Sequence, residues 1–315
     1  MASPRVSVLL TCYNHLPFLK KAWASLWAQT FTDFEVIALD DESTDGTRGW
    51  LAARPENFHL HLNESNLGTY GTLNLGLEMA KGEFIAIFND DDLWAPRKLE
   101  EQVALLDSDP EVGLVHTDGV FIDGRGEEIQ HNPLGFDYPR FPTGYILPEF
   151  FYQNMVIASA ALFRKECVDR VGGFDKHFFG SGDWRMWARI ATQYKVGFVD
   201  EKLTSYRIHG ASASHRLDEI WMDDEQLRTW LVGVGEQLLA RDPKIAGLKH
   251  YSAEQIRDAV AHNWACLGTA RKLNGNSRGA RTAYRKSLEY RPGRFKSKLR
   301  MAATLLPRGV FRRTL

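Results

Sequence analysis

The sequence predicts an α/β fold: a doubly wound, mostly parallel sheet flanked by helices, followed by a helical C-terminal appendage. Two observations lead to this prediction. The first half of the chain alternates short β-branched and aromatic runs with stretches of helical spacing, and after about Leu217 helical periodicity dominates. With 315 residues, the chain is also long enough for one large α/β domain and a smaller unit.

The predicted elements follow one another with short connections. A buried run at 6–10 predicts the first strand, apolar residues at helical spacing over 18–27 predict the first helix, and the run at 34–39 predicts the second strand. A helix after Thr44, a strand at 58–62, a helix over 68–80 closed by Gly82, and a strand at 84–88 continue the pattern. The second half adds a buried strand at 154–163 and a helix that begins at Asp183.

Composition excludes several classes of protein. The chain is 44% hydrophobic and 25% charged, which is typical of a soluble globular protein, and 39 Lys and Arg against 40 Asp and Glu predict no nucleic-acid partner. Cys12, Cys167 and Cys266 lack the spacing of a zinc site. The N-terminal apolar stretch is too short for a signal peptide, and no apolar window approaches the ~18 residues that cross a bilayer. We therefore expect a cytoplasmic protein.

Polar clusters follow three of the predicted strands, at the point where each strand ends. They occupy positions 11–14, 40–43 and 90–92. Because ligands of open parallel sheets bind beyond the carboxyl ends of the strands, we expect all three clusters to line one crevice. The turn after the first strand reads TCYNHLPF, without the glycines of a dinucleotide-binding loop, and a Walker lysine motif is also absent from the sequence. A metal held by carboxylates then becomes the better way to bind phosphates.

The cluster Asp90, Asp91 and Asp92 is the strongest chemical signal in the chain. Three consecutive carboxylates at the end of a buried strand repel one another and lose hydration, so a bound cation would stabilise them. Mg²⁺ and Mn²⁺ favour oxygen ligands and bridge to diphosphates. The alternative is a solvated loop whose last aspartate, Asp92, caps the next helix.

At this point the sequence resembles a known family. SVLLTCYNHLPFLKKAWASLWAQTFTDFEVIALDDESTDGT and NLGTYGTLNLGLEMAKGEFIAIFNDDDLWAPRKLE are similar to the nucleotide-sugar domain of family 2 inverting glycosyltransferases, which have the GT-A fold. The similarity spans about 6–110 and resumes weakly to about His209. It implies a donor half at about 1–110 and an acceptor half at 111–216 of a domain covering 1–216, with 217–315 as a helical region.

The resemblance also implies a role for individual residues. Tyr13 would stack on the nucleobase and Asp41 would accept its N–H, although a packed tyrosine and a plain turn are the alternatives. The remaining donor contacts fall on Thr11, Asn14, Asn74, Asn89 and Asp90. Relatives often carry an acid where this chain has Asn89, so the ribose contact is either Asn89 or Asp90.

The same resemblance places the metal and the catalytic base. Asp91 and His209 would bind Mn²⁺ or Mg²⁺, with a structural histidine as the alternative for His209. Asp183 would be the general base, or else a plain cap of its helix. Relatives often have an acid where this chain has Gly182, so the acceptor contacts stay open. Independently of the resemblance, the loop from Asp123 to Pro148 carries the aromatic residues Phe136, Tyr138, Phe141 and Tyr145, which either stack on sugar rings or pack the loop itself.

The C-terminal region carries two further signals. The spacing of Trp264, Gly268, Ala280 and Tyr284 follows one tetratricopeptide-like unit, which we expect to form a helical hairpin packed on the catalytic domain, with homodimerisation as a second role. The stretch 294–313 is basic and interleaved with apolar residues, so it either lies on an anionic membrane surface or docks as a last helix.

Together these features predict a metal-dependent inverting glycosyltransferase. It would move a sugar from a nucleotide-diphosphate sugar, UDP-linked by our expectation, to a hydroxyl of a glycan or lipid-linked acceptor in cell-surface polysaccharide or glycoconjugate synthesis. We expect it in the cytoplasm or at the inner face of the membrane. The alternative is a non-catalytic nucleotide-sugar-binding or scaffolding protein of the same fold, which Asn89 and Gly182 favour.

Overall fold

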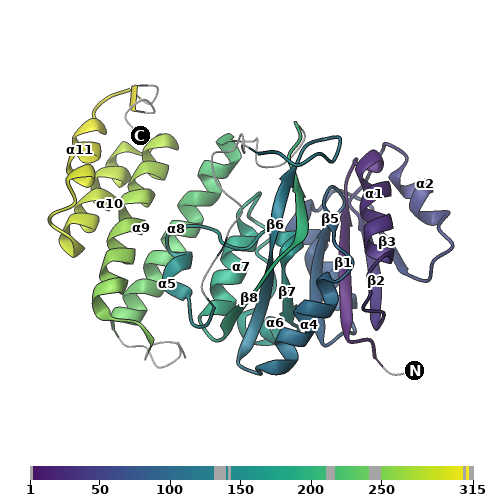
Figure 1. Cartoon of the computed structure of the whole chain (residues 1–315). Coiled ribbons are helices and arrows are strands. Elements are labelled where there is room, and N and C mark those ends of the chain that lie inside the picture. Colours follow the sequence, from purple (N-terminus) through teal and green to yellow (C-terminus); the bar gives the residue numbers. More distant parts are fainter. Residues whose placement is uncertain are drawn as a thin grey trace. The chain divides into compact units, whose positions relative to one another are not determined.

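The computed structural model describes residues 3–130, 140, 143–210, 217–240, 250–307 and 310–311 (Figure 1). For residues 217–221 it describes the backbone alone. The predicted aromatic residues Phe136, Tyr138 and Phe141 lie outside these residues. The chain divides into two compact units. The first comprises Met1–Ile146, Met155–Phe178 and Gly182–Ser212, and the second comprises Leu147–Asn154, Phe179–Ser181 and Ala213–Leu315. We keep 1–216 and 217–315 as proposed domain limits.

The first unit is built on a sheet with the strand order β3-β2-β1-β4-β7-β6-β8-β5. Strands β1 to β4 are parallel, β6 pairs parallel with β8, and β7 and β5 run antiparallel to their neighbours. The predicted α/β class is therefore confirmed, with a sheet that is mixed in its second half. The strands are β1 (Val6–Cys12), β2 (Phe34–Asp40), β3 (His59–Leu62), β4 (Phe84–Asn89), β5 (Leu93–Trp94), β6 (Val112–Ile122), β7 (Leu162–Arg164) and β8 (Lys195–Arg207).

Helices cover both faces of this sheet. Val8 and Leu10 of β1 pack in one core with side chains of α1 and α4, whereas Leu9 lies on the opposite face, close to Gly76 of α3. Alternate residues of a strand point to opposite faces, so a continuous apolar run such as β1 is the expected sequence of a strand covered on both sides. The helices of this unit are α1 (Leu16–Trp27), α2 (Thr47–Ala52), α3 (Gly68–Met79), α4 (Lys98–Ser108), α6 (Glu166–Val171) and α7 (Gly182–Ala191).

One predicted strand is much shorter than expected. The run 154–163 forms a 3₁₀ turn (Ala158–Ala160) and then only the three-residue strand β7. Its Ser159 is engaged by other elements, because the Ser159 hydroxyl accepts the Asn89 N–H at 3.1 Å and the Ser159 carbonyl accepts the Trp94 indole N–H at 2.7 Å. These contacts bury the segment without the ladder hydrogen bonds of a strand. Burial was predictable from the apolar run, but the backbone conformation was not.

The second unit is helical. It contains α5 (Leu147–Phe150), α8 (Leu217–Leu239), α9 (Ala253–Leu273), α10 (Ser277–Tyr290) and α11 (Phe295–Ala303), of which α9, α10 and α11 lie side by side in Figure 1. Only three residues separate α9 from α10, and the Tyr284 ring of α10 lies over Gly268 of α9. In the part of the chain that the structure describes, no helix is both long and apolar enough to cross a bilayer.

Candidate nucleotide-sugar and metal site

The polar clusters after β1, β2 and β4 meet at one edge of the sheet. The register pairs Cys12 with Asp40 and Thr11 with Asn89, so all three strands end at the same level. The following loops are joined by hydrogen bonds, among them the Tyr13 N–H to Asp90 Oδ2 at 2.9 Å. The expectation that these clusters line one crevice agrees with this register.

The loop after β1 presents an aromatic ring to solvent. Tyr13 is 48% exposed although its backbone is fixed by Asp90. Asn14 has a left-handed backbone (φ 57°), and its Oδ1 accepts the Thr44 N–H at 2.7 Å, which ties this loop to the one after β2. An exposed, anchored ring is what a base-stacking residue needs. The side chain of Asn14 serves the loop, and its predicted donor contact stays a prediction.

Asp40 and Asp41 have different surroundings. Asp40 is fully buried and accepts Arg48 Nε at 2.6 Å, so it belongs to the support of the loop. Asp41 is 5% exposed, and its Oδ1 accepts both the Asn63 amide at 2.8 Å and the Leu67 N–H at 2.7 Å. Two donors on one oxygen fix the carboxylate orientation and leave Oδ2 as the atom that would receive the N–H of a base.

The three consecutive aspartates also have different surroundings. Asp90 is bonded through one oxygen to Tyr13 N–H and through the other to His15 Nδ1, at 2.9 Å each. Asp92 is fully buried, and its Oδ1 accepts the Arg207 N–H at 2.8 Å. The prediction that Asp92 caps a helix is wrong, since α4 begins six residues later at Lys98 and Asp92 instead fastens the end of β8.

Burial affects the pKa of two of these carboxyl groups. It raises the pKa of Asp90, although the His15 hydrogen bond works in the other direction, and it raises the pKa of Asp92 well above the ordinary value, with the charge of Asp91 adding to the effect. Asp91 is the more accessible of the three, with 16% of its side chain exposed. Asp91 is therefore the carboxyl group of the three that a ligand from solvent would reach first.

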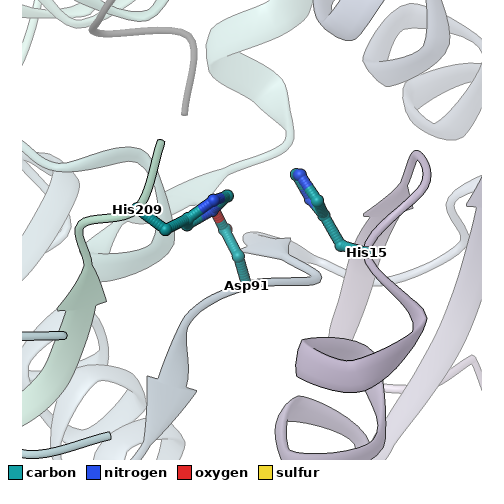
Figure 2. A group of neighbouring side chains, drawn as sticks. All are labelled: His15, Asp91 and His209. Carbon is teal, nitrogen blue, oxygen red and sulfur yellow. The ribbon is translucent and has the colours of Figure 1, made fainter. Parts of the chain in front are cut away.

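Asp91 belongs to a cluster of three metal-type ligands. One atom each of His15, Asp91 and His209 lies within 4.8 Å of the others, and His209 Nε2 is 3.0 Å from Asp91 Oδ2. Figure 2 shows His209 against the Asp91 carboxylate and the His15 ring facing them from the loop after β1. Sequence analysis named Asp91 and His209 but missed His15, which directly follows the 11–14 cluster and could have been counted with it.

His15 has a defined orientation. Its Nδ1 is bonded to Asp90 Oδ1, which leaves Nε2 as the ring atom for a ligand. Burial alone would lower the pKa of His15, but the hydrogen bond and the charge of Asp90 outweigh it and raise the pKa above the ordinary value. A histidine whose second nitrogen bonds a carboxylate is the arrangement that metal-binding histidines normally have.

Asp183 is the second residue of α7 and lies in a partly buried position, where its Oδ1 accepts the Trp184 N–H at 2.6 Å. Packing explains why a glycine, Gly182, precedes it. A Cβ on Gly182 would lie 2.6 Å from the ring of Tyr70, which itself stacks on Phe174. An acidic side chain at 182 therefore has no room beside Tyr70.

Asn74 has a structural task in this unit. Its Nδ2 donates to the Phe174 carbonyl and its Oδ1 accepts the Phe174 N–H, both at 2.8 Å. The side chain thus holds the turn that carries Phe174, and the predicted donor contact of Asn74 stays a prediction. Thr11 lies beside the site, with its hydroxyl 3.4 Å from Asn89 Oδ1.

The sequence is similar to those of known proteins. The chain is 28% identical over 276 residues to an uncharacterised glycosyltransferase of Nostoc sp., covering 80% of this chain and 84% of the relative. It is 27% identical to an uncharacterised glycosyltransferase of Methanocaldococcus jannaschii, covering 66% of this chain and 72% of the relative.

Two solved structures share the fold. TarS residues 1–349 of S. aureus in complex with UDP-GlcNAc align with a TM-score of 0.66 at 16% identity, over 98% of this chain and 88% of that one. The mannosyltransferase PcManGT of Pyrobaculum calidifontis in complex with GDP-Man and Mn²⁺ aligns with a TM-score of 0.53 at 21% identity, over 98% and 87%. The model of glycosyl transferase family 2 matches residues 7–172, more than half of the chain, and the chain therefore belongs to that family.

Proposed function

We propose that this protein is a metal-dependent inverting glycosyltransferase that moves a sugar from a UDP-linked donor to an acceptor hydroxyl. The observation that carries the proposal is the meeting of Tyr13, Asp41 and Asp91 at the carboxyl ends of three adjacent parallel strands. The exposed ring of Tyr13 and the oriented carboxylate of Asp41 suit the face and the N–H of a base, and the metal-type ligand Asp91 suits a diphosphate. Solved structures of the same fold contain either a uridine nucleotide (UDP, UDP-GlcNAc) or a guanosine nucleotide (GDP-Man). The choice of uracil as the base is therefore part of the proposal.

The donor would lie across the strand ends. Tyr13 would stack on the base, and Asp41 Oδ2 would accept the base N–H because Oδ1 is already occupied by Asn63 and Leu67. Asn89 and Asp90 lie between this position and the metal cluster along the chain. Since both oxygens of Asp90 are engaged by Tyr13 and His15, Asn89 is the better candidate for the ribose.

The donor set fits Mn²⁺ better than Mg²⁺. His15, Asp91 and His209 supply two imidazoles and one carboxylate, and imidazole suits transition metals, whereas Mg²⁺ prefers an all-oxygen shell. The 3.0 Å between His209 Nε2 and Asp91 Oδ2 also matches neighbouring ligands on one ion with bonds of about 2.1 Å. A bound cation there would neutralise the charge that develops on the leaving diphosphate.

Asp183 would act as the general base. Its carboxylate would take the proton of the acceptor hydroxyl while the hydroxyl oxygen forms a bond to the anomeric carbon. The bond between that carbon and the diphosphate oxygen breaks on the opposite face, and the nucleoside diphosphate leaves with the electron pair. A single displacement of this kind inverts the anomeric centre. The acceptors we propose are glycan or lipid-linked hydroxyls of cell-surface polysaccharides and glycoconjugates, and the location we propose is the cytoplasm or the inner membrane face.

A non-catalytic nucleotide-sugar-binding protein is the second candidate, favoured by Asn89 at a position where relatives often have an acid. The glycine at 182 no longer supports it, because Tyr70 fills the space that a side chain would need. Asp91, His209 and Asp183 are all present, which favours the enzyme.

Release of UDP from UDP-sugars, measured with and without Mn²⁺, distinguishes the two candidates. We expect Mn²⁺-dependent release that Asp183→Asn lowers by at least about 10²-fold, the lower range for loss of a general base. Asp169→Asn, an exposed carboxylate on α6, is the matched control and should behave as wild type. Binding of UDP without metal-dependent turnover of any donor would instead support the non-catalytic candidate.

A further inference from the structure

Helix α11 packs on its unit through Met301 and Ala303 but leaves two large apolar side chains exposed. Ser297 and Thr304 are 1% and 2% exposed and face the unit, whereas Phe295 and Leu299 are 67% and 54% exposed. Ser297 Oγ is 3.1 Å from the Ser287 hydroxyl of α10. An exposed Phe and Leu on one face of a helix that already packs by another face form an apolar patch of the kind that interaction surfaces have.

The exposed apolar residues form one stripe. At 3.6 residues per turn, positions 295, 299 and 302 fall within about 60° of one another. Beyond the helix end, Leu305 and Leu306 are also exposed, at 80% and 40%. The exposed Lys296 and Lys298 flank this stripe on its two sides. We call Phe295, Lys296, Lys298, Leu299 and Leu306 the α11 face.

Charge identifies the partner. The sequence contains no acidic residue after Glu289, although the whole chain has a formal net charge of −1, so positive charge is concentrated around α11. Lysines beside an exposed Phe and Leu complement a surface that is anionic at its head groups and apolar beneath them. We propose that the α11 face binds the surface of a bilayer that contains anionic lipids, with Phe295 and Leu299 inserted and the two lysines at the head groups.

Vesicle flotation of the full chain tests this proposal without any measurement of turnover. The vesicles are phosphatidylcholine alone or mixed with phosphatidylserine. We expect binding to the mixed vesicles, a loss of at least about tenfold in Phe295→Ser/Leu299→Ser, and a loss of about fivefold for each lysine changed to Gln. The control Leu62→Ser removes a 41% exposed leucine on β3, and Lys20→Gln/Lys176→Gln removes two exposed lysines elsewhere.

Three results would overturn the proposal. Wild type could fail to float with the mixed vesicles, the apolar double variant could float as well as wild type, or the control lysines could matter as much as Lys296 and Lys298. Sedimentation of the same variants identifies the competing occupant. If the wild type does not bind vesicles but self-associates, and Phe295→Ser/Leu299→Ser abolishes the self-association, the α11 face is a contact between two copies of the chain.

A second inference rests on a different observation, the buried Asp223 of α8. Its carboxylate accepts the backbone N–H groups of the three consecutive residues 179–181, with distances of 2.9, 2.6 and 2.9 Å to Oδ2. Asp223 is 2% exposed, and all four residues belong to the second unit. Three amides on one carboxylate oxygen define the conformation of this short loop.

The loop leads directly into the segment of the proposed base. Ser181 is followed in the chain by Gly182 and Asp183, the first two residues of α7. We infer that Asp223 is a positioning residue for the base at Asp183, which rests on the function proposed above. An asparagine at 223 would keep one acceptor oxygen for the three N–H groups, but it would lose the negative charge that strengthens these hydrogen bonds and the second acceptor for the Phe179 N–H.

The test separates positioning from folding. For Asp223→Asn we expect a fall of about 10–10²-fold in the kcat of Mn²⁺-dependent UDP release, with an unchanged Kd for UDP. The matched control is Glu225→Gln, two residues along α8, whose carboxylate bonds Arg271 and Asn274 of the C-terminal helices. Equal kcat values for the two variants at equal thermal stability would refute the inference. An inactive wild type would refute the proposed function instead.

Discussion

Asp90→Asn offers the sharpest test of the metal site, because Asp90 holds a proposed ligand without being one. Its Oδ1 lies 2.9 Å from His15 Nδ1 and its Oδ2 accepts the Tyr13 N–H at 2.9 Å. An amide can replace only one of these two oxygens as an acceptor, so one contact is lost. Carboxylates that orient metal-binding histidines are worth about 10–100-fold in metal affinity. We therefore expect the Kd for Mn²⁺ to rise by that factor, about 1.4–2.8 kcal/mol.

The same substitution should make metal binding less sensitive to acid, even though it weakens the affinity. His15 binds a metal only when neutral, and its pKa is raised because the hydrogen bond and charge of Asp90 outweigh burial, which lowers it. Affinity of the wild type should thus fall as the pH drops through this raised pKa. In Asp90→Asn the charge is gone, the pKa of His15 falls, and the acid limb moves to lower pH. The ratio of the Kd for Mn²⁺ of Asp90→Asn to that of wild type should therefore decrease as the pH is lowered from about 8 to about 6.

Free Mn²⁺ measured by electron paramagnetic resonance during a titration gives the Kd directly. Asp33→Asn, an exposed aspartate before β2, serves as the control and should leave both Kd and its pH dependence unchanged. A Kd within twofold of wild type, or an acid limb at the wild-type pH, would contradict the assignment of His15 as an Asp90-oriented ligand. A variant that loses affinity equally at all pH values would point to disruption of the loop alone.

Three further outcomes are expected. Tyr13→Ala should weaken UDP binding by about 1–3 kcal/mol, the measured worth of base stacking, with little change in thermal stability because the ring is exposed; calorimetry checks both. Gly182→Ala should destabilise the protein by about 1–3 kcal/mol because its Cβ meets the Tyr70 ring, and Tyr70→Leu should restore part of this loss in denaturant unfolding. Gly268→Ala places a Cβ 3.0 Å from the Tyr284 ring, so the melting temperature should fall despite the gain in helix propensity.

Local patterns were sufficient to predict the strands of the donor half and the edge at which their loops meet. The alternation of apolar strands and helical periodicity places positions 11–14, 40–43 and 90–92 together, because parallel strands end on the same side. Contacts between distant segments were not predictable in this way. The partner of Asp92 is Arg207, 115 residues away, and the ring that excludes a side chain at Gly182 comes from Tyr70 on another helix. A sequence pattern shows that such residues are unusual but not which residue faces them.

The aspartate run illustrates why identical neighbours cannot be assigned one role. Successive residues at a strand end point in different directions, so Asp90 turns to the β1 loop, Asp92 to the end of β8, and Asp91 to His209. Asp91 is the most exposed of the three carboxyl groups and is therefore the one that a donor would approach. A donor diphosphate would be repelled by a carboxylate at this position. A divalent cation between them would turn that repulsion into two attractions, and the imidazoles of His15 and His209 would complete its ligands without adding negative charge. We therefore expect metal dependence in donor binding as well as in turnover.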